Sequence, residues 1–191
     1  MNQRLLPMLA VASAPFDSAE YLFEVKWDGV RALAAGGPGG WSVWGRDVAD
    51  YSARYPELAV LGRFPAGTVL DGELVRWGPD GLSNLGAILK RHHLTNPARI
   101  EQASRSQPVC YVVFDLLHLR GRSLLGEPLQ RRREALQELL QRLRERYVRP
   151  LRQCRPQHPL RRRRDRLPAL AAPRRRRRLR GRARDRDGRR E

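Results

Sequence analysis

The chain has 191 residues, enough for one globular domain with a single core. Its formal net charge of +18 is unevenly placed, because residues 147–191 carry 19 basic and 4 acidic side chains whereas residues 1–146 carry 19 and 16. No stretch approaches about 20 apolar residues and the 2 cysteines form no CxxC pair, which argues against a membrane span, a zinc site and a disulfide framework.

The first predicted element is a strand at residues 21–27. Apolar residues alternate there with Glu24 and Lys26, which is the period-2 pattern of a strand and places these two charges on one face. Asp28 and Gly29 then predict a turn. The patterns that follow complete an antiparallel meander, with strands at residues 30–35 and 41–44 around a glycine-rich loop at residues 36–40.

A second group of elements follows. The patterns predict helical segments at residues 54–64, 85–91, 98–104 and 129–146, and strands at residues 68–75 and 109–117. Asp71 and Glu73 share one face of their strand, so we expect two carboxylates on an exposed or cleft-lining surface. The last strand is apolar nearly throughout, which is typical of a strand covered on both faces. The last helix has a leucine stripe at Leu136, Leu139, Leu140 and Leu143.

These elements predict an α+β domain at residues 1–146, built from antiparallel sheet with flanking helices. Residues 147–191 consist largely of arginine and proline and have almost no periodic apolar pattern. Such a composition cannot bury enough surface to offset the loss of chain entropy, so we expect a disordered arginine-rich tail. His92 and His93 follow a basic pair and are expected at the surface.

Lys26-Trp27-Asp28-Gly29 fits the KxDG nucleophile motif of covalent nucleotidyltransferases, the group that includes ATP-dependent ligases, RNA ligases and capping enzymes. A deprotonated lysine amine can attack the α-phosphorus of a nucleoside triphosphate and form a phosphoramidate. A free lysine titrates at about 10.4, so neighbouring cations, a metal ion or partial burial must lower its pKa. The alternative interpretation is a strand-edge lysine paired with Glu24.

Three further strings resemble successive motifs of the ATP-dependent DNA ligase family, in the expected order. They are GRDVADYSARYPEL at residues 45–58, LDGELV at residues 70–75 and YVVFDLLHLRGRSL at residues 111–124. The family more often has Ser-Arg-Asn-Gly where this chain has Gly45-Arg46-Asp47-Val48. The sequences of these segments most resemble the ligase modules of bacterial end-joining ligases. This resemblance implies an ATP-grasp-like nucleotidyltransferase fold.

The resemblance implies roles for six residues, with Lys26 as the acceptor of AMP. The other implied roles are a contact near adenine for Glu24, phosphate or ribose contacts for Arg31 and Arg46, ribose and metal contacts for Glu73, and stacking on adenine for Phe114.

The activity implied by the resemblance is ATP-dependent DNA ligation with Mg²⁺ or Mn²⁺. AMP passes from lysine to the 5′-phosphate of a nick, and the neighbouring 3′-hydroxyl displaces it. The implied partners are nicked or broken double-stranded DNA and end-joining repair proteins, for a monomer in the bacterial cytoplasm with no membrane contact. Two alternatives remain: an inactive fragment that binds ATP or nucleic acid only, and an RNA ligase or capping-type nucleotidyltransferase.

The resemblance stops near Leu143, and the later family motifs have no counterpart. One of these supplies a metal-binding glutamate, and another is a Lys-x-Lys motif that holds the α-phosphate, yet no lysine follows Lys90. A terminal OB-fold domain is missing as well, so we expect an incomplete domain with weak activity. The tail has two interpretations: the product of a reading-frame shift after about residue 145, or an arm that binds nucleic acid through phosphate charge.

Overall fold

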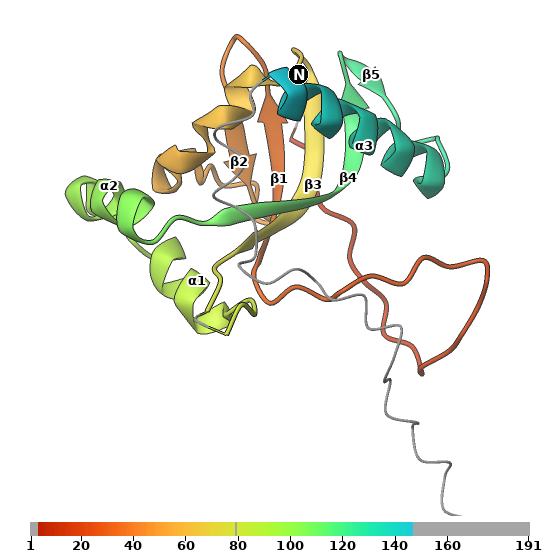
Figure 1. Cartoon of the computed structure of the whole chain (residues 1–191), viewed down its shortest axis with the longest axis horizontal. Coiled ribbons are helices and arrows are strands. Elements are labelled where there is room, and N and C mark those ends of the chain that lie inside the picture. The colour runs from red at the N-terminus through yellow and green to blue at the C-terminus, as the bar shows by residue number, and fades with distance from the viewer. Residues whose placement is uncertain (1–3, 79, 147–191) are drawn as a thin grey trace, which may run out of the picture. The chain divides into compact units, whose positions relative to one another are not determined.

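The computed structural model describes residues 4–78 and 80–146. In chain order the elements are β1 (Val30–Gly36), β2 (Ser42–Trp44), η1 (Ser52–Arg54), η2 (Pro56–Arg63), β3 (Thr68–Val75), α1 (Leu85–His92), α2 (Pro97–Ser106), β4 (Cys110–Leu119), β5 (Arg122–Ser123) and α3 (Leu129–Arg146). The strands form one antiparallel sheet in the order β2-β1-β3-β4-β5, and helices flank it (Figure 1). This confirms the predicted α+β class.

The central strand β3 has the predicted bounds and is buried along nearly its whole length. It pairs with β1, where Arg31 lies opposite Glu73, and with β4 on its other edge. Leu70 and Leu74 belong to the main core cluster, whereas Val69 belongs to a smaller second cluster. Because side chains alternate along a strand, the second cluster lies on the opposite face of the sheet, the face to which Glu73 also points.

The main core lies between the sheet and the helical elements η2, α1 and α3. In α3, which packs against β4 (Figure 1), Leu136 and Leu139 are buried as the predicted leucine stripe requires. The segment predicted as a helix at residues 54–64 forms a short 3-10 helix, η2, whose Leu58 and Leu61 are buried. Apolar burial on these faces is the main term that holds the sheet and helices together.

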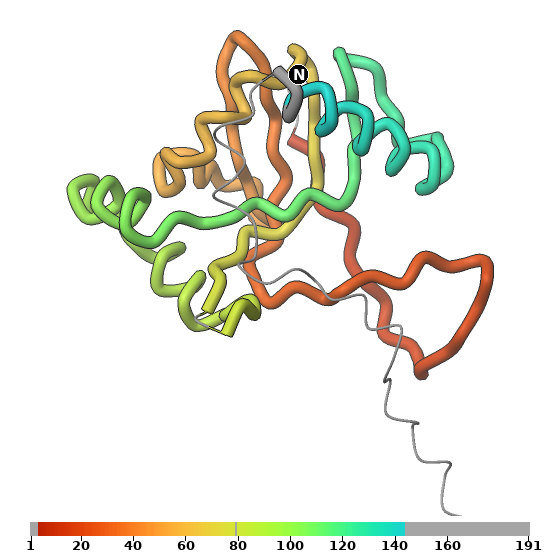
Figure 2. The backbone as a smooth tube through the Cα atoms, in the orientation of Figure 1, coloured from red at the N-terminus to blue at the C-terminus, as the bar shows by residue number. Residues whose placement is uncertain are grey.

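Residues 21–27 do not form the strand that their alternation predicts. Within residues 4–78 and 80–146 no strand pairs with them, and Figure 2 shows the red part of the chain as an open loop ahead of β1. The alternation specifies a face, but a strand also needs a hydrogen-bonded neighbour. Four apolar side chains of this segment are consequently exposed, those of Tyr21, Leu22, Phe23 and Val25, and the predicted meander is reduced to the β1–β2 hairpin.

Two further expectations need correction. His92 is half-buried rather than superficial, because its ring lies between Tyr51 and Tyr55 and its Nδ1 is 2.7 Å from the Tyr55 hydroxyl. Burial lowers its pKa below the usual value. His93 is exposed as expected. The middle of β4 is only partly buried, so this strand is not covered on both faces throughout. The arginine-rich tail lies outside the described residues.

Candidate active site

A cavity of about 570 Å³ beside the sheet brings together all six residues to which the sequence analysis gave a role. They come from the segment before β1, from β1 itself, from the loop after β2, and from β3 and β4; they are Glu24, Lys26, Arg31, Arg46, Glu73 and Phe114. Residues 7–10 close another side of the cavity. Segments that lie far apart in the sequence therefore meet around one space.

The turn after Lys26 is held against β3. A Cβ atom at Gly29 would lie 2.3 Å from the Leu74 carbonyl oxygen and 2.7 Å from Cγ of Glu73, so a side chain there would force the turn away from the strand. The Gly29 amide donates a hydrogen bond to the Glu73 carboxylate, and the Asp28 amide donates to Oγ of Ser83 at 3.0 Å. The glycine of the KxDG motif thus sets this turn beside the acidic strand.

The Lys26 amine is an exposed ammonium group in this state. Its Nζ lies 2.9 Å from Oδ1 of Asp28, and the hydrogen bond and charge of Asp28 raise the pKa of Lys26. The expected alternative, a pair with Glu24, is wrong, because Glu24 forms an ion pair with Arg133 of α3. The lowered pKa that a lysine nucleophile needs is therefore absent here, and attack requires the Lys26–Asp28 pair to open.

Glu73 lies half-buried at the base of the Lys26 turn. Burial raises the pKa of its carboxyl group, and the positive charges of Arg31 and Lys26 oppose that change. Over residues 4–78 and 80–146 no three His, Cys, Asp or Glu side chains gather as a metal site. Magnesium is commonly held by one or two carboxylates together with substrate phosphates, and a single carboxylate such as Glu73 fits that mode.

Asp71, the other carboxylate of β3, is buried and does not line the cavity, so the expectation of an exposed or cleft-lining surface holds for Glu73 and is wrong for Asp71. It accepts two hydrogen bonds from Arg31, at 2.6 Å from Nε and 2.8 Å from Nη2. The Arg31 guanidinium also lies 4.4 Å from the centre of the Phe114 ring. Arg31 is therefore fixed in orientation by a fork-shaped ion pair and by one face of an aromatic ring.

Phe114 lies at an irregularity of β4. Asp71 pairs with Asp115 and Gly72 pairs with Val113, so Phe114 is the extra residue between two successive pairs. A bulge of this kind bends the strand and redirects a side chain. The Phe114 ring accordingly lines the cavity, although its apolar neighbours along β4 would favour a place in the core.

Tyr111, the other aromatic residue of the same motif, belongs to the core. Its ring covers Gly72, where an added Cβ would lie 2.6 Å from ring atom Cε2. Its hydroxyl donates to the carbonyl oxygen of Ala32 at 2.9 Å. The glycine of the LDGELV string is thus required by packing, and the two aromatic residues divide between core and cavity.

Arg46 is exposed on the cavity wall, in a loop with a strained backbone. Two residues later Val48 has φ of +53°, a left-handed conformation that a β-branched residue rarely adopts. Asp47 anchors the loop, since its Oδ1 accepts hydrogen bonds from the Tyr51 hydroxyl at 2.5 Å and from the Ala49 amide at 3.2 Å. The glycine usual in the family at the Val48 position would adopt this φ without strain.

Three contributors to the site were not predicted. The alternation of β3 predicts Asp71 on an exposed or cleft-lining surface, whereas it is buried in an ion pair with an arginine 40 positions away. Trp27 is only the variable position of the KxDG motif, yet its side chain lines the cavity. Its ring centre lies 5.6 Å from the ring centre of Trp77, in an edge-to-face contact. Residues 7–10 carry no polar signal that could have identified them.

Known proteins resemble this chain over most of its described part. Residues 7–153 match the family described as ATP dependent DNA ligase domain. The chain is 34% identical to the multifunctional non-homologous end joining DNA repair protein LigD of Mycobacterium tuberculosis, over 71% of this chain and 17% of LigD. It is also 34% identical to DNA ligase C1 of Mycolicibacterium smegmatis, over 69% of this chain and 40% of that ligase.

Among solved structures, mycobacterial DNA ligase D complexed with ATP and MES matches with a TM-score of 0.49 at 32% identity, over 62% of this chain and 36% of that one. The chain thus spans well under half the length of these relatives. None of the helices in the described part of the chain is long and apolar enough to cross a membrane. On the match of residues 7–153, the chain belongs to the ATP-dependent DNA ligase domain family.

Proposed function

We propose that this chain acts as the adenylation part of an ATP-dependent DNA ligase and that Lys26 carries AMP. The observation that carries the proposal is the single cavity lined by Lys26, Glu73 and Phe114 together with the other three candidate residues. Each of these three groups suits one part of a bound nucleoside triphosphate. The lysine amine suits the α-phosphorus, the carboxylate suits the ribose and a metal ion, and the aromatic ring suits the base.

The position of the ring supports nucleotide binding. Arg31 covers one face of Phe114, which leaves the other face for adenine, and an arginine on the far face adds to the attraction between ring and base. Glu24 would border the base, and the exposed guanidinium of Arg46 would contact ribose or phosphate oxygens. Arg31 would act mainly by orienting the Phe114 ring, because Nε and Nη2 of its guanidinium already donate to Asp71.

The transfer step forms one bond and breaks one bond. The lone pair of Lys26 Nζ attacks the α-phosphorus, the bond from phosphorus to the bridging pyrophosphate oxygen breaks, and the ammonium proton passes to solvent. Glu73 is the residue that would hold Mg²⁺ or Mn²⁺, which when bound neutralises phosphate charge. Approach of the triphosphate would also compete with Lys26 for its ion pair with Asp28.

The later steps lie with DNA. AMP would pass from Lys26 to the 5′-phosphate of a nick or broken end, and the adjacent 3′-hydroxyl would then displace it. The similarity to an end joining DNA repair protein supports broken DNA in a bacterial cell as the substrate. The proposed roles of the six cavity residues concern the nucleotide. None of these residues is proposed as an acid or base for the DNA step.

The two lysines of the chain make the proposal testable. Incubation with α-labelled ATP and Mg²⁺ should give a covalent label that is stable to alkali and labile to acid. Lys26→Ala should abolish the label, whereas Lys90→Ala, which changes the other lysine on the exposed side of α1, should keep it. Equal labelling of both variants would refute Lys26 as the acceptor.

A second candidate function is ATP binding without transfer. The raised pKa of Lys26 and its ion pair with Asp28 favour this reading, since a protonated amine cannot attack. In that case ATP would raise the melting temperature of the protein, and this rise would be lost in a Phe114 variant, while no covalent label would appear. Parallel reactions with GTP would identify a capping-type activity.

A further inference from the structure

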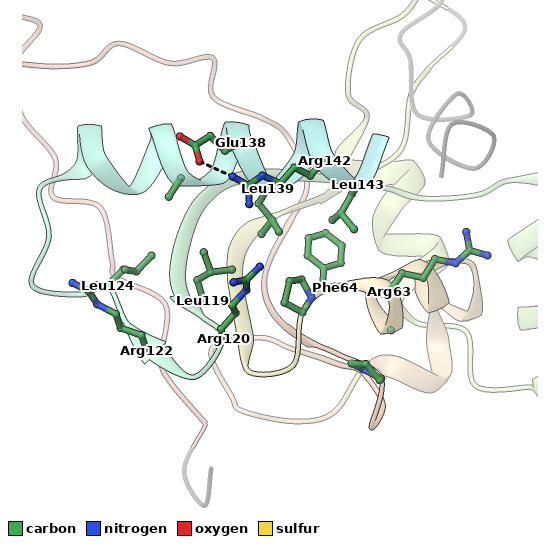
Figure 3. A pocket seen from close by; sticks show the side chains of 14 residues that line it. Arg63, Phe64, Leu119, Arg120, Arg122, Leu124, Glu138, Leu139, Arg142 and Leu143 are labelled. Carbon is green, nitrogen blue, oxygen red and sulfur yellow. Dashed lines mark ion pairs between the residues drawn. The ribbon is translucent and has the colours of Figure 1, made fainter. Parts of the chain in front are cut away.

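A second cavity, of about 910 Å³, lies between α3, the end of η2 and the β4–β5 hairpin. It shares no lining residue with the candidate active site. Figure 3 shows its apolar floor, to which Phe64, Leu119, Leu124, Leu139 and Leu143 contribute. These side chains belong to the main core or pack against it. The cavity is therefore a place where the core reaches the surface.

Four arginines surround this floor, and we call the whole feature the basic groove: Arg63, Arg120, Arg122 and Arg142 (Figure 3). Its lining contains one carboxylate, Glu138, which lies 3.6 Å from Arg142 in a largely exposed pair. Arg122 makes another exposed pair with Glu127 outside the lining. Exposed pairs of this kind are weak, so these two guanidinium groups can exchange partners readily.

Arg120 occupies a position that the turn itself disfavours. It has φ of +53° and is followed by Gly121 at φ of +81°, a two-residue hairpin turn that usually carries Asn, Asp or Gly. The turn cannot move away, because the Gly121 amide donates to the Gly67 carbonyl oxygen at 3.1 Å and a Cβ at Gly67 would lie 2.5 Å from the Gly121 nitrogen. Within residues 4–78 and 80–146 the Arg120 guanidinium has no hydrogen-bond or ion-pair partner, so a cation is held in a strained turn without an internal use.

We propose that the basic groove is a docking site for an acidic amphipathic segment of a partner protein. An apolar floor takes the apolar face of such a segment, and the arginine rim pairs with carboxylates on either side of that face. Residues 147–191 carry 19 basic and 4 acidic side chains, so their net charge has the same sign as the arginine rim, whereas an acidic segment has the complementary sign.

A nucleic acid strand is less well matched to this groove. Bases bind proteins by stacking on accessible aromatic rings, and the aromatic residue of the groove, Phe64, is only 7% exposed. Leucine side chains offer a base or phosphate no specific contact, whereas they complement the leucines and phenylalanines of an amphipathic helix. Apolar contact and charge together therefore favour a peptide.

Fluorescence anisotropy with the full chain tests the proposal. The probe is a labelled peptide with leucines at helical spacing and glutamates elsewhere, and its control is a scrambled peptide of the same composition. Both peptides have the same net charge and therefore the same electrostatic attraction to residues 147–191. A difference between their affinities then reports binding to the groove. The Arg120→Asn variant should fold, because asparagine readily adopts the left-handed conformation of this turn. We expect it to weaken binding of the peptide with leucines at helical spacing, called the striped peptide, by about five- to tenfold. Arg142→Asn should act in the same direction.

Arg99→Asn is the matched control, because it removes one exposed arginine from α2 outside the groove and should leave binding unchanged. A photo-crosslinker on the striped peptide should attach to peptides that contain residues 119–124 or 138–143. The proposal is overturned if the striped and scrambled peptides bind equally, or if neither binds. It is also overturned if an oligothymidylate binds with the same dependence on Arg120 and displaces the peptide.

Discussion

At the scale of single residues, the proposed chemistry depends on how Lys26 loses its proton. The amine stands at the edge of the cavity, but Asp28 holds it as a cation and raises its pKa. Glu73 lies near enough to interact with that charge. A lysine nucleophile is active only in its neutral form, so the residue that holds the proton on Lys26 sets the pH at which transfer begins.

We predict a shifted pH profile for Asp28→Asn. The rate of lysyl-AMP formation should rise with pH as the neutral fraction of Lys26 grows. Asp28 raises the pKa of Lys26, so its removal lowers that pKa and the rise should begin at lower pH. Single-turnover rates measured across the alkaline range check this. The exposed variant Asp17→Asn serves as control, and an unchanged midpoint in Asp28→Asn would show that another group holds the proton.

We predict that Phe114 contributes to ATP affinity through its ring. Stacking of a base on an aromatic side chain contributes about 1–3 kcal/mol, so Phe114→Leu should raise the Kd for ATP by about tenfold or more. Phe114→Tyr keeps the ring and should bind nearly as well as the unchanged protein. Isothermal titration with ATP measures both variants. Equal affinities of the Leu and Tyr variants would mean that the ring does not contact adenine.

At the scale of elements, strand pairing decides which residues meet. The antiparallel register of β1 and β3 places Arg31 opposite Glu73 and within reach of Asp71. The bulge in β4 then turns Phe114 toward the cavity, where its ring meets Arg31. The cavity is therefore built on the most buried strand of the sheet, from which Glu73 reaches it.

We predict coupling between Arg31 and Asp71 across these two strands. Arg31→Leu leaves a buried carboxylate without its partner and should destabilise the fold by about 2 kcal/mol, a value reduced because Arg31 is partly exposed. Adding Asp71→Asn should restore part of that loss. Urea unfolding of the single and double variants gives the interaction energy. Strict additivity of the two changes would show that the ion pair contributes nothing to stability.

We predict that Val48→Gly stabilises the protein. Release of the left-handed strain at Val48 should outweigh the extra chain entropy of glycine, for a net gain of about 1 kcal/mol and a rise in Tm of about 3 °C. Val48→Ala, which removes the β-branch but keeps a Cβ, should gain less. Thermal melting compares the three proteins. A lower Tm in the glycine variant would mean that the Val48 side chain stabilises the loop by packing.

At the scale of the whole molecule, few cations face the proposed nucleotide site. The described part of the cavity offers Lys26, Arg31 and Arg46, and carboxylates already pair with two of them, Asp28 with Lys26 and Asp71 with Arg31. Loss of one preorganised group that stabilises developing charge commonly costs about 10²–10³ in rate. We therefore predict that the chain as given forms lysyl-AMP slowly and seals nicked DNA at least about a hundredfold more slowly than mycobacterial LigD. A gel assay of nick sealing beside mycobacterial LigD measures this ratio, and comparable rates would contradict it.

The sequence predicted much of this molecule where a local pattern was sufficient. Strand β3 and helix α3 have their predicted bounds, because alternation and a leucine stripe each define one buried face. The strand expected at residues 21–27 is absent, since its pattern carried no information about a pairing partner. The burial of Asp71 and the outward turn of Phe114 depend on Arg31 and on a bulge, both consequences of long-range pairing.

The placement of AMP on Lys26 is tested most directly by tandem mass spectrometry of the protein after incubation with ATP and Mg²⁺. Proteolysis under alkaline conditions preserves a phosphoramidate, and the chain has just two lysines to distinguish. We predict an adenylyl group on the peptide that contains Lys26 and none on the peptide that contains Lys90. An adenylyl group on Lys90, or on a residue outside the cavity, would contradict the assignment.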